Sequence, residues 1–181
     1  MNEGLLPRRY AKALYEFACE KDCSQRVYTL MKTLVKSFSE MPSLGVTLSN
    51  PYVSNSDKVT LLNTAAGATD TDSVFTDFLK LLEHNNRLGF CRDIAQAYID
   101  LYRVKNHIFE VHVTSAAPFS SQEEQRLKSM IESHLHGGVM EYHHGINPDL
   151  IGGFTVSVGN ERLDASVSNE LNQLRLNLLS K

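Results

Sequence analysis

The sequence has no long apolar run. No stretch approaches the roughly 20 residues that a helix needs to span a bilayer, and the opening from Met1 to Leu14 lacks the apolar core and cleavage site of a signal peptide. These absences argue against a membrane-spanning or secreted protein. We therefore expect synthesis in the cytoplasm and contact with a membrane only through a partner.

Cysteine is scarce and basic charge is not in excess. The three cysteines, Cys19, Cys23 and Cys91, are an odd count that fits a reducing compartment better than a disulfide scaffold. Cys19 and Cys23 lack CxxC spacing, so partly buried thiols explain them better than a metal or redox pair. Lysines and arginines number 18 against 21 acidic residues, and this net charge of -3 argues against a nucleic-acid-binding protein.

Motifs of common enzyme classes are also missing. No Gly-Lys-Ser/Thr triplet occurs, and no serine lies in a Gly-x-Ser-x-Gly sequence. The adjacent acidic residues Glu123 and Glu124 suit a helix N-terminus, where negative charge meets the helix dipole. We therefore predict no catalytic residues and no cofactor site.

Four histidines are the most enzyme-like feature, since imidazoles are common metal ligands. They fall within eleven positions of each other: His134, His136, His143 and His144. The first two diverge by about 200° on a helix, and the last two point to opposite faces of a strand. At most two could converge, so we expect solvent-facing histidines and no metal site.

The first part of the chain has a helical pattern. With 42% hydrophobic residues among 181, the chain can bury one large or two small cores. Up to residue 105 the apolar residues recur at helical spacing with short connections, which indicates a compact helical bundle. Asn50-Pro51 ends one helix, and Ser54 with Asp57 resembles a capping box that begins the next.

The pattern changes at Asn106. Apolar residues then alternate with polar ones over 109–114, as in a strand with one solvated face. A capping box at 120–124 begins a helix, and further strands are predicted at 139–144, 154–158 and 161–164, with a tight turn at Gly159-Asn160.

A last helix completes the predicted architecture. Ser166 can cap this helix, which carries an apolar stripe of Leu171, Leu174 and Leu178. The sequence therefore predicts an α+β protein. A helical bundle occupies residues 1–105, and a small α/β domain, a short sheet with two helices, occupies residues 106–181.

Residues 150–167 carry the most specific motif. Gly152-Gly153 leads into a strand, so close approach of two backbones explains these glycines better than a phosphate-binding loop does. The segment resembles the signature of the delta subunit of F-type ATP synthase, called OSCP in mitochondria. The matching residues are Leu150, Ile151, Gly152, Gly153, Gly159, Asp164, Ser166 and Val167. Asn147 and Ala165 depart from the usual Asp and Gly of the family without changing the spacing.

Weaker matches to the same family occur in order along the whole chain. They are RRYAKALYEFA at 8–18, Asn50-Pro51 with Lys58 and Leu62, Phe78-Leu79 with Leu82, Arg87-Leu88, and Val113 to Ala116. The resemblance implies a six-helix N-terminal bundle and a small C-terminal α/β domain. It also implies a stator subunit with no catalysis of its own.

The resemblance further implies partners and a location. The N-terminal domain would bind the N-terminal helix of an alpha subunit in the catalytic alpha/beta hexamer, and the C-terminal domain would bind the b subunits of the peripheral stalk. Such a subunit resists rotor torque and supports proton-driven ATP synthesis. It would lie, as a peripheral part of the complex, on the cytoplasmic face of the bacterial plasma membrane.

In this family the alpha-subunit helix occupies a groove between the first and fifth helices. The corresponding candidates are Tyr10, Ala13, Leu14, Phe17, Phe78, Leu81 and Leu82. Arg8, Arg9 and Lys12 could pair with an acidic partner, although periodicity alone also allows the candidates to be bundle core. Two other classes remain open: a free-standing helical adaptor, and a metal-dependent enzyme that uses the histidines.

Overall fold

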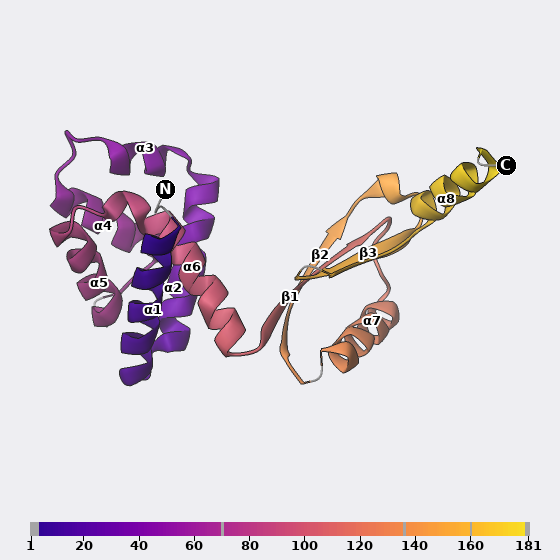
Figure 1. Cartoon of the computed structure of the whole chain (residues 1–181), viewed down its shortest axis with the longest axis horizontal. Helices are drawn as coiled ribbons and strands as arrows, with labels where there is room; N and C mark the ends of the chain where they lie inside the picture. The colour runs from indigo at the N-terminus through magenta and orange to yellow at the C-terminus, as the bar shows by residue number, and fades with distance from the viewer. Residues whose placement is uncertain (1–3, 70, 136, 160, 180–181) are drawn as a thin grey trace. The chain divides into compact units, whose positions relative to one another are not determined.

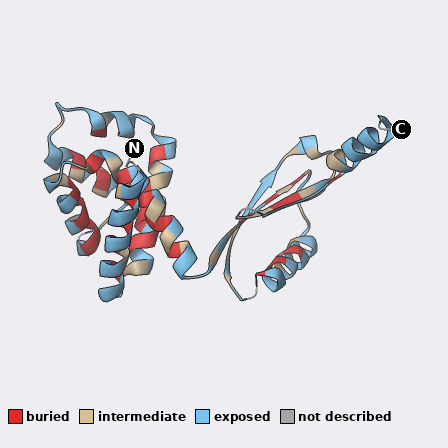
Figure 2. Cartoon of the chain, in the orientation of Figure 1, coloured by how far each residue is buried: buried red, intermediate tan, exposed pale blue. Residues whose placement is uncertain are grey.

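The computed structural model describes residues 4–69, 71–135, 137–159 and 161–179 (Figure 1). Its contacts divide the chain into two compact units, Met1–Val104 and Lys105–Lys181. Each unit has its own buried core, which Figure 2 shows in red. The arrangement of helices before strands confirms the α+β class predicted from the sequence.

The first unit, called unit 1, is a bundle of helices. Its elements are α1 (Leu5–Glu20), α2 (Ser24–Glu40), α3 (Ser43–Ser49), α4 (Asn55–Ala66), α5 (Ser73–His84), η1 (Leu88–Phe90) and α6 (Cys91–Lys105). Helix α3 ends at Ser49, directly before the predicted break at Asn50-Pro51. The hydroxyl of Ser54 accepts a hydrogen bond from the Asp57 amide, so the predicted cap at the start of α4 is confirmed.

Aliphatic and aromatic side chains from every long helix fill the bundle. Helix α2 contributes Met31 and Leu34, which are fully buried against α4 and the neighbouring helices. Burial raises the pKa of the Cys91 thiol to about 12. The prediction of partly buried thiols concerned Cys19 and Cys23, and it is confirmed for Cys23 but wrong for Cys19, which is exposed. The second cysteine, Cys23, has its pKa raised by partial burial as well.

A partly buried ion pair also links two helices of unit 1. The guanidinium of Arg26 on α2 donates two hydrogen bonds of 2.8 Å to the carboxylate of Asp72, the residue before α5. The amide of Thr69 donates a third, also 2.8 Å long. The hydrogen bonds from Arg26 hold the pKa of Asp72 well below its usual value.

The second unit, called unit 2, is a mixed sheet with helices. Its elements are β1 (Ile108–Ser115), α7 (Ser121–His134), β2 (Val139–Ile146), η2 (Pro148–Leu150), β3 (Gly153–Val158), β4 (Glu161–Ser166) and α8 (Val167–Leu179). The strand order is β2-β1-β3-β4, with β1 parallel to β2 and antiparallel to β3. Helix α7 makes the crossover between the two parallel strands.

The core of unit 2 lies between α7 and one face of the sheet. Val111 and Val113 of β1 are buried against Leu127 and Ile131 of α7, while His112 points to the solvated face. The predicted alternation is therefore confirmed at Val111 to Val113, whereas Phe109 near the start of β1 is 37% exposed. Ser120 and Glu123 form the predicted capping box at the start of α7.

All four strands are longer than predicted, and β2 and β4 each run two residues further at their C-terminal ends. β2 continues to Ile146 and β4 to Ser166, because the pairings Ser115–Ile146 and Gly153–Ser166 extend the ladders at one end of the sheet. The leucines of α8 give a second difference. The helix forms as predicted, but none of its described residues is buried.

Candidate partner-binding surface

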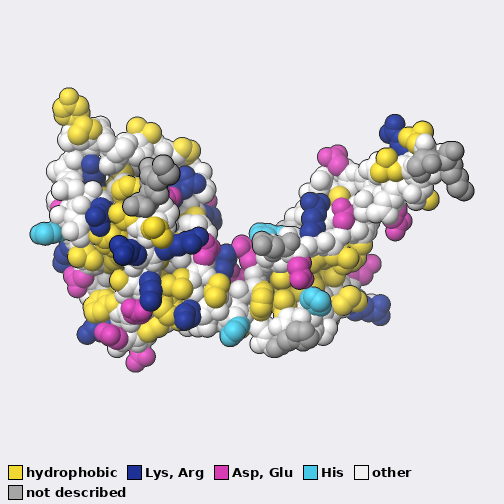
Figure 3. Space-filling model, viewed as in Figure 1, with side chains coloured by type: hydrophobic (Ala, Val, Ile, Leu, Met, Phe, Trp, Pro, Cys, Tyr) yellow, Lys and Arg dark blue, Asp and Glu magenta, His cyan; other side chains and the backbone are white. Residues whose placement is uncertain are grey.

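The candidate surface lies on helices α1 and α5, which run antiparallel to each other. Tyr10, early in α1, contacts Phe78 and Arg87, while Phe17, late in α1, lies at a hollow shared with Asp77. Hydrophobic side chains are exposed on this face of unit 1, with lysines and arginines around them (Figure 3).

The structure sorts the predicted groove residues into two groups. Ala13, Phe17 and Leu81 are exposed, the last two with 40% and 49% of their surface accessible, and Tyr10 is half-buried. The other three belong to the bundle core: Leu14 (3% exposed), Phe78 (6%) and Leu82 (0%). Their side chains point inward, because α1 and α5 pack on the bundle through them. We therefore no longer expect these three residues to contact the partner directly; they hold α1 and α5 in position.

One end of the surface is built around Tyr10. Its hydroxyl accepts a hydrogen bond of 2.6 Å from Arg87 and one of 3.3 Å from Asn85. The Arg87 guanidinium also lies 5.4 Å from the centre of the tyrosine ring. These contacts hold the ring beside a hollow of about 250 Å³ that Leu5, Leu6 and Arg9 help to line. No sequence pattern indicated that Asn85 and Arg87 position Tyr10.

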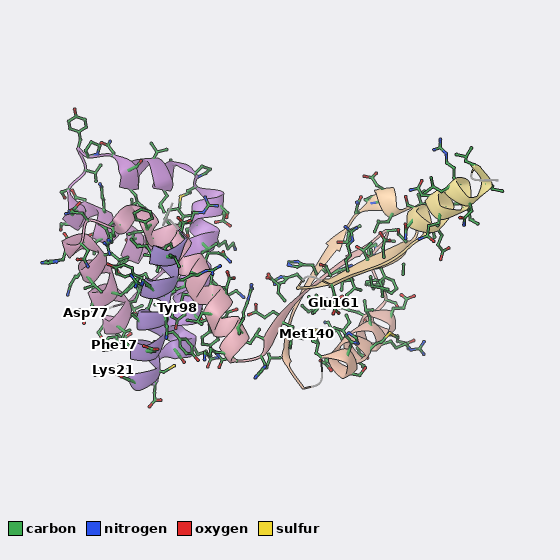
Figure 4. All side chains as sticks on the ribbon, viewed as in Figure 1. Phe17, Lys21, Asp77, Tyr98, Met140 and Glu161 are labelled. Carbon is green, nitrogen blue, oxygen red and sulfur yellow. The ribbon has the colours of Figure 1, made fainter. Side chains whose placement is uncertain are left out.

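The other end of the surface is built around Phe17. Lys21 directly follows the last residue of α1, and its ammonium nitrogen lies 5.9 Å from the centre of the Phe17 ring. Phe17, Lys21 and Asp77 lie close together in Figure 4 and line a hollow of about 640 Å³ between α1, α2 and α5. A hollow at each end and the small Ala13 between them leave room for a helix.

Charged side chains surround the apolar strip, which consists of Tyr10, Ala13, Phe17 and Leu81. Arg8 and Arg9 are exposed on the first turns of α1. Lys12 pairs with Glu16 at 3.8 Å and Lys80 pairs with Asp77 at 3.3 Å, and all four side chains are more than half exposed. Exposed pairs of this kind contribute about 0–1 kcal/mol each, so they leave the basic groups available to an acidic partner.

The signature glycines of unit 2 have a structural role. Gly153 has a φ of +74°, and a Cβ built there would overlap the carbonyl oxygen of Ala165 on the paired strand. A Cβ on Gly152 would lie 3.0 Å from Val167, whose amide donates a hydrogen bond to the Gly152 carbonyl. The predicted close approach of backbones is confirmed.

The other signature residues join β4 to α8. The carboxylate of Asp164 accepts hydrogen bonds from the Ser166 hydroxyl at 2.6 Å and the Ser166 amide at 3.1 Å, and these bonds lower its pKa. The Ser166 hydroxyl in turn accepts from the amide of Asn169, as predicted for a helix cap. Leu150 ends the turn η2, Ile151 follows it with a φ of +64°, and Gly159 has a φ of +55° after β3.

The histidines do not form one cluster. His134 lies 3.7 Å from Glu161, His143 stacks on His112 beside Glu110, and His144 contacts Ser115 at 2.8 Å. His136 lies outside the described residues. Among the residues that the structure describes, no three His, Cys, Asp or Glu side chains are placed to hold a metal ion, and no helix is long and apolar enough to cross a bilayer.

Comparisons with known proteins agree with one another. The sequence pattern of the family described as ATP synthase delta (OSCP) subunit matches residues 6–178. ATP synthase subunit delta of Bacteroides thetaiotaomicron is 37% identical, covering 100% of this chain and 97% of the relative. ATP synthase subunit 5, mitochondrial, of Yarrowia lipolytica is 32% identical over 91% of this chain and 78% of the relative.

A solved structure has the same fold. One chain in the cryo-EM structure of the Toxoplasma gondii mitochondrial ATP synthase hexamer superposes with a TM-score of 0.71 over 96% of this chain and 97% of that chain. Its sequence identity is 23%, so this likeness concerns the fold alone. The family match and the identity to curated relatives over the full chain give the assignment: this chain belongs to the ATP synthase delta (OSCP) subunit family.

Proposed function

We propose that this chain is a non-catalytic stator subunit that joins the alpha/beta head of an F-type ATP synthase to the peripheral stalk. The observation that carries the proposal is the exposed apolar strip on α1 and α5, in a chain of this family. In the complex the subunit would resist rotor torque and so support proton-driven ATP synthesis. It would lie on the cytoplasmic face of the bacterial plasma membrane.

A stator contact must dissociate slowly under load. Surface ion pairs are too weak for this, at about 0–1 kcal/mol each, so an apolar contact of roughly 800 Å² per partner is a sensible minimum. Two compact units in one chain also allow two simultaneous contacts, and each contact then raises the effective concentration of the other.

Unit 1 is assigned to the N-terminal helix of an alpha subunit. The strip between Tyr10 and Phe17 spans two turns of α1, about 10 Å, with exposed Leu81 on the facing helix. An amphipathic helix presents its apolar residues at this spacing. The basic residues Arg8 and Arg9 favour a partner helix that carries acidic side chains beside its apolar stripe.

A substitution on α5 tests this assignment. We expect Leu81→Asp to weaken binding of an alpha N-terminal peptide at least tenfold, because a carboxylate would be desolvated against the apolar face of the peptide. Fluorescence anisotropy measures the affinity. Tyr10→Asp should weaken the binding too. Because this change also removes the hydrogen bond from Arg87, the melting curve of the variant shows whether unit 1 is still folded. Val46→Asp on α3, also exposed but outside the strip, is the control; unchanged affinity in Leu81→Asp would remove Leu81 from the site.

A truncation tests the assignment of unit 2 to the b subunits. A fragment that ends after residue 105 contains all of α1 to α6, so we expect it to bind the alpha peptide with the affinity of the full chain. The same fragment should no longer capture the b subunits in a pull-down. Retention of the stalk by this fragment would show that the two units do not divide the partners in this way.

A further inference from the structure

Two basic side chains of unit 1 meet at one end of the apolar strip without an acidic partner. Arg9 of α1 and Arg87, which follows α5, both line the hollow beside Tyr10. Among the residues that the structure describes, no carboxylate lies within ion-pair distance of either guanidinium group. The lysines further along the strip, by contrast, are paired with acidic residues of their own helices. The lining of this hollow therefore carries two positive charges and no negative charge.

Most of the hydrogen-bonding capacity of Arg87 is unused. Its guanidinium group, which is partly buried, donates one hydrogen bond of 2.6 Å to the hydroxyl of Tyr10. A guanidinium group has five N–H donors in a planar fork. Such a fork binds a carboxylate through two parallel hydrogen bonds, so a carboxylate is the acceptor that suits the remaining donors.

The hydroxyl of Tyr10 supplies a further donor. Its oxygen accepts hydrogen bonds from Arg87 and from Asn85, which together occupy its two lone pairs. Within the part of the chain that the structure describes, the proton of this hydroxyl has no acceptor. The hydroxyl can therefore donate to a ligand, which fits an anion and not an ammonium group.

The backbone around the hollow also favours negative charge. Leu5 and Leu6 bring the first turn of α1 to the hollow, and this turn contains no acidic residue. The N-cap residue, Gly4, provides no capping side chain, so the positive end of the helix dipole is not neutralised there. The last carbonyls of α5, at the same end of the strip, already accept hydrogen bonds from the amides of residues 85–87.

We infer that the hollow beside Tyr10 binds one carboxylate side chain of the partner helix, which accepts hydrogen bonds from Arg9, Arg87 and the Tyr10 hydroxyl. The inference rests on the proposed function of unit 1, and it adds the place at which the partner helix must be acidic. That residue would lie beside the apolar stripe, at the end of the helix that faces the first turn of α1. Leu5 and Leu6 give the hollow an apolar wall for the methylene groups of the same side chain.

Neutral variants of the protein and of the partner test the inference together. The probe is a synthetic peptide of the alpha N-terminal helix from the same complex, amidated at its C-terminus. A set of further peptides has each acidic residue changed to its amide in turn. We expect Arg87→Gln in the full chain to weaken binding of the parent peptide about tenfold, because charge-assisted hydrogen bonds are the strong ones. Arg9→Gln should weaken it about threefold, since solvent screens this exposed side chain. Fluorescence anisotropy measures both affinities.

One peptide of the set should identify the acidic residue that occupies the hollow. Once that residue is neutral, Arg9→Gln and Arg87→Gln should change the affinity less than about twofold, because the interacting partner is gone. Arg92→Gln on α6 is the matched control, since it removes the same charge from an exposed arginine outside the hollow. If Arg87→Gln loosens Tyr10, Arg9→Gln still gives the answer, because Arg9 has no hydrogen bond or ion pair with the described residues.

The outcomes separate this inference from the proposed function. Equal affinity of the parent peptide for the wild type and both hollow variants would leave unit 1 on the alpha helix but overturn the carboxylate site. A loss in both variants that persists with every peptide of the set would indicate general attraction by positive charge, and the site would again be refuted. No binding by the wild type would overturn the assignment of unit 1 to the alpha helix, and the carboxylate site with it.

Discussion

At the scale of single residues, the fold of unit 1 depends on the ion pair between Arg26 and the buried Asp72. The carboxylate is buried, and removal of its partner would leave an unpaired charge inside the bundle. The pKa of Asp72 is lowered by the hydrogen bonds from Arg26. The pair therefore stabilises the fold above the pKa of an unfolded aspartate, about 3.9, and this stabilisation is lost as the pH falls toward the folded-state pKa.

A neutral substitution makes that pH dependence measurable. We expect Asp72→Asn to lower the free energy of unfolding by about 2 kcal/mol at pH 7, and the difference from the wild type should shrink as the pH falls below about 4. Urea denaturation at pH 7 and pH 3 measures both values. Asp77→Asn, on an exposed side chain, is the control; an equal difference at the two pH values would contradict the role of the charge.

Single residues were also where the sequence was least informative. Arg26 and Asp72 lie 46 positions apart, and no local pattern connects them. Likewise, helical spacing placed Leu14 and Phe17 on adjoining faces of α1 without showing that one faces the core and the other the solvent. That distinction depends on the crossing of α1 with α5, which is a tertiary property.

At the scale of elements, local patterns were enough to predict most helices and strands. Alternation identified β1, and capping residues identified the starts of α4 and α7, because these signals come from the segment itself. An apolar groove between α7 and β4 was not predictable, since it depends on how far one helix covers a four-stranded sheet. The exposed stripe of α8 likewise needed the tertiary structure.

The close pairing of β3 with β4 gives a prediction at this scale. We expect Gly153→Ala to destabilise unit 2 by at least about 2 kcal/mol, because alanine disfavours a positive φ and its Cβ meets the backbone of Ala165. Thermal unfolding followed by circular dichroism measures the loss. Gly145→Ala on β2 is the matched control, since a Cβ added there would meet no atom within 4 Å; equal melting of the two variants would refute the close approach.

At the scale of the whole molecule, the chain consists of two units with separate cores. Separate cores allow separate unfolding transitions, since two-state behaviour holds for single domains rather than for pairs of domains. A core substitution in one unit should then leave the transition of the other unit in place.

Paired core substitutions test this independence. We expect Leu62→Ala, at a fully buried position of α4, to cost about 2–5 kcal/mol and to lower only the melting transition of unit 1. Ile131→Ala on α7 should lower only that of unit 2. Differential scanning calorimetry resolves the two transitions. A shift of both transitions in either variant would mean that the units stabilise each other.

The direct junction of β4 and α8 has a mechanical consequence. A pull on α8 along its axis passes into β4 without a slack segment, and Ser166 fixes the joint. The hydrogen bonds between antiparallel strands lie across the strand direction, so a pull directed along β4 would load its six paired positions with β3 together. A short hairpin loaded along its strands resists sliding better than a hairpin that is opened from one end resists peeling.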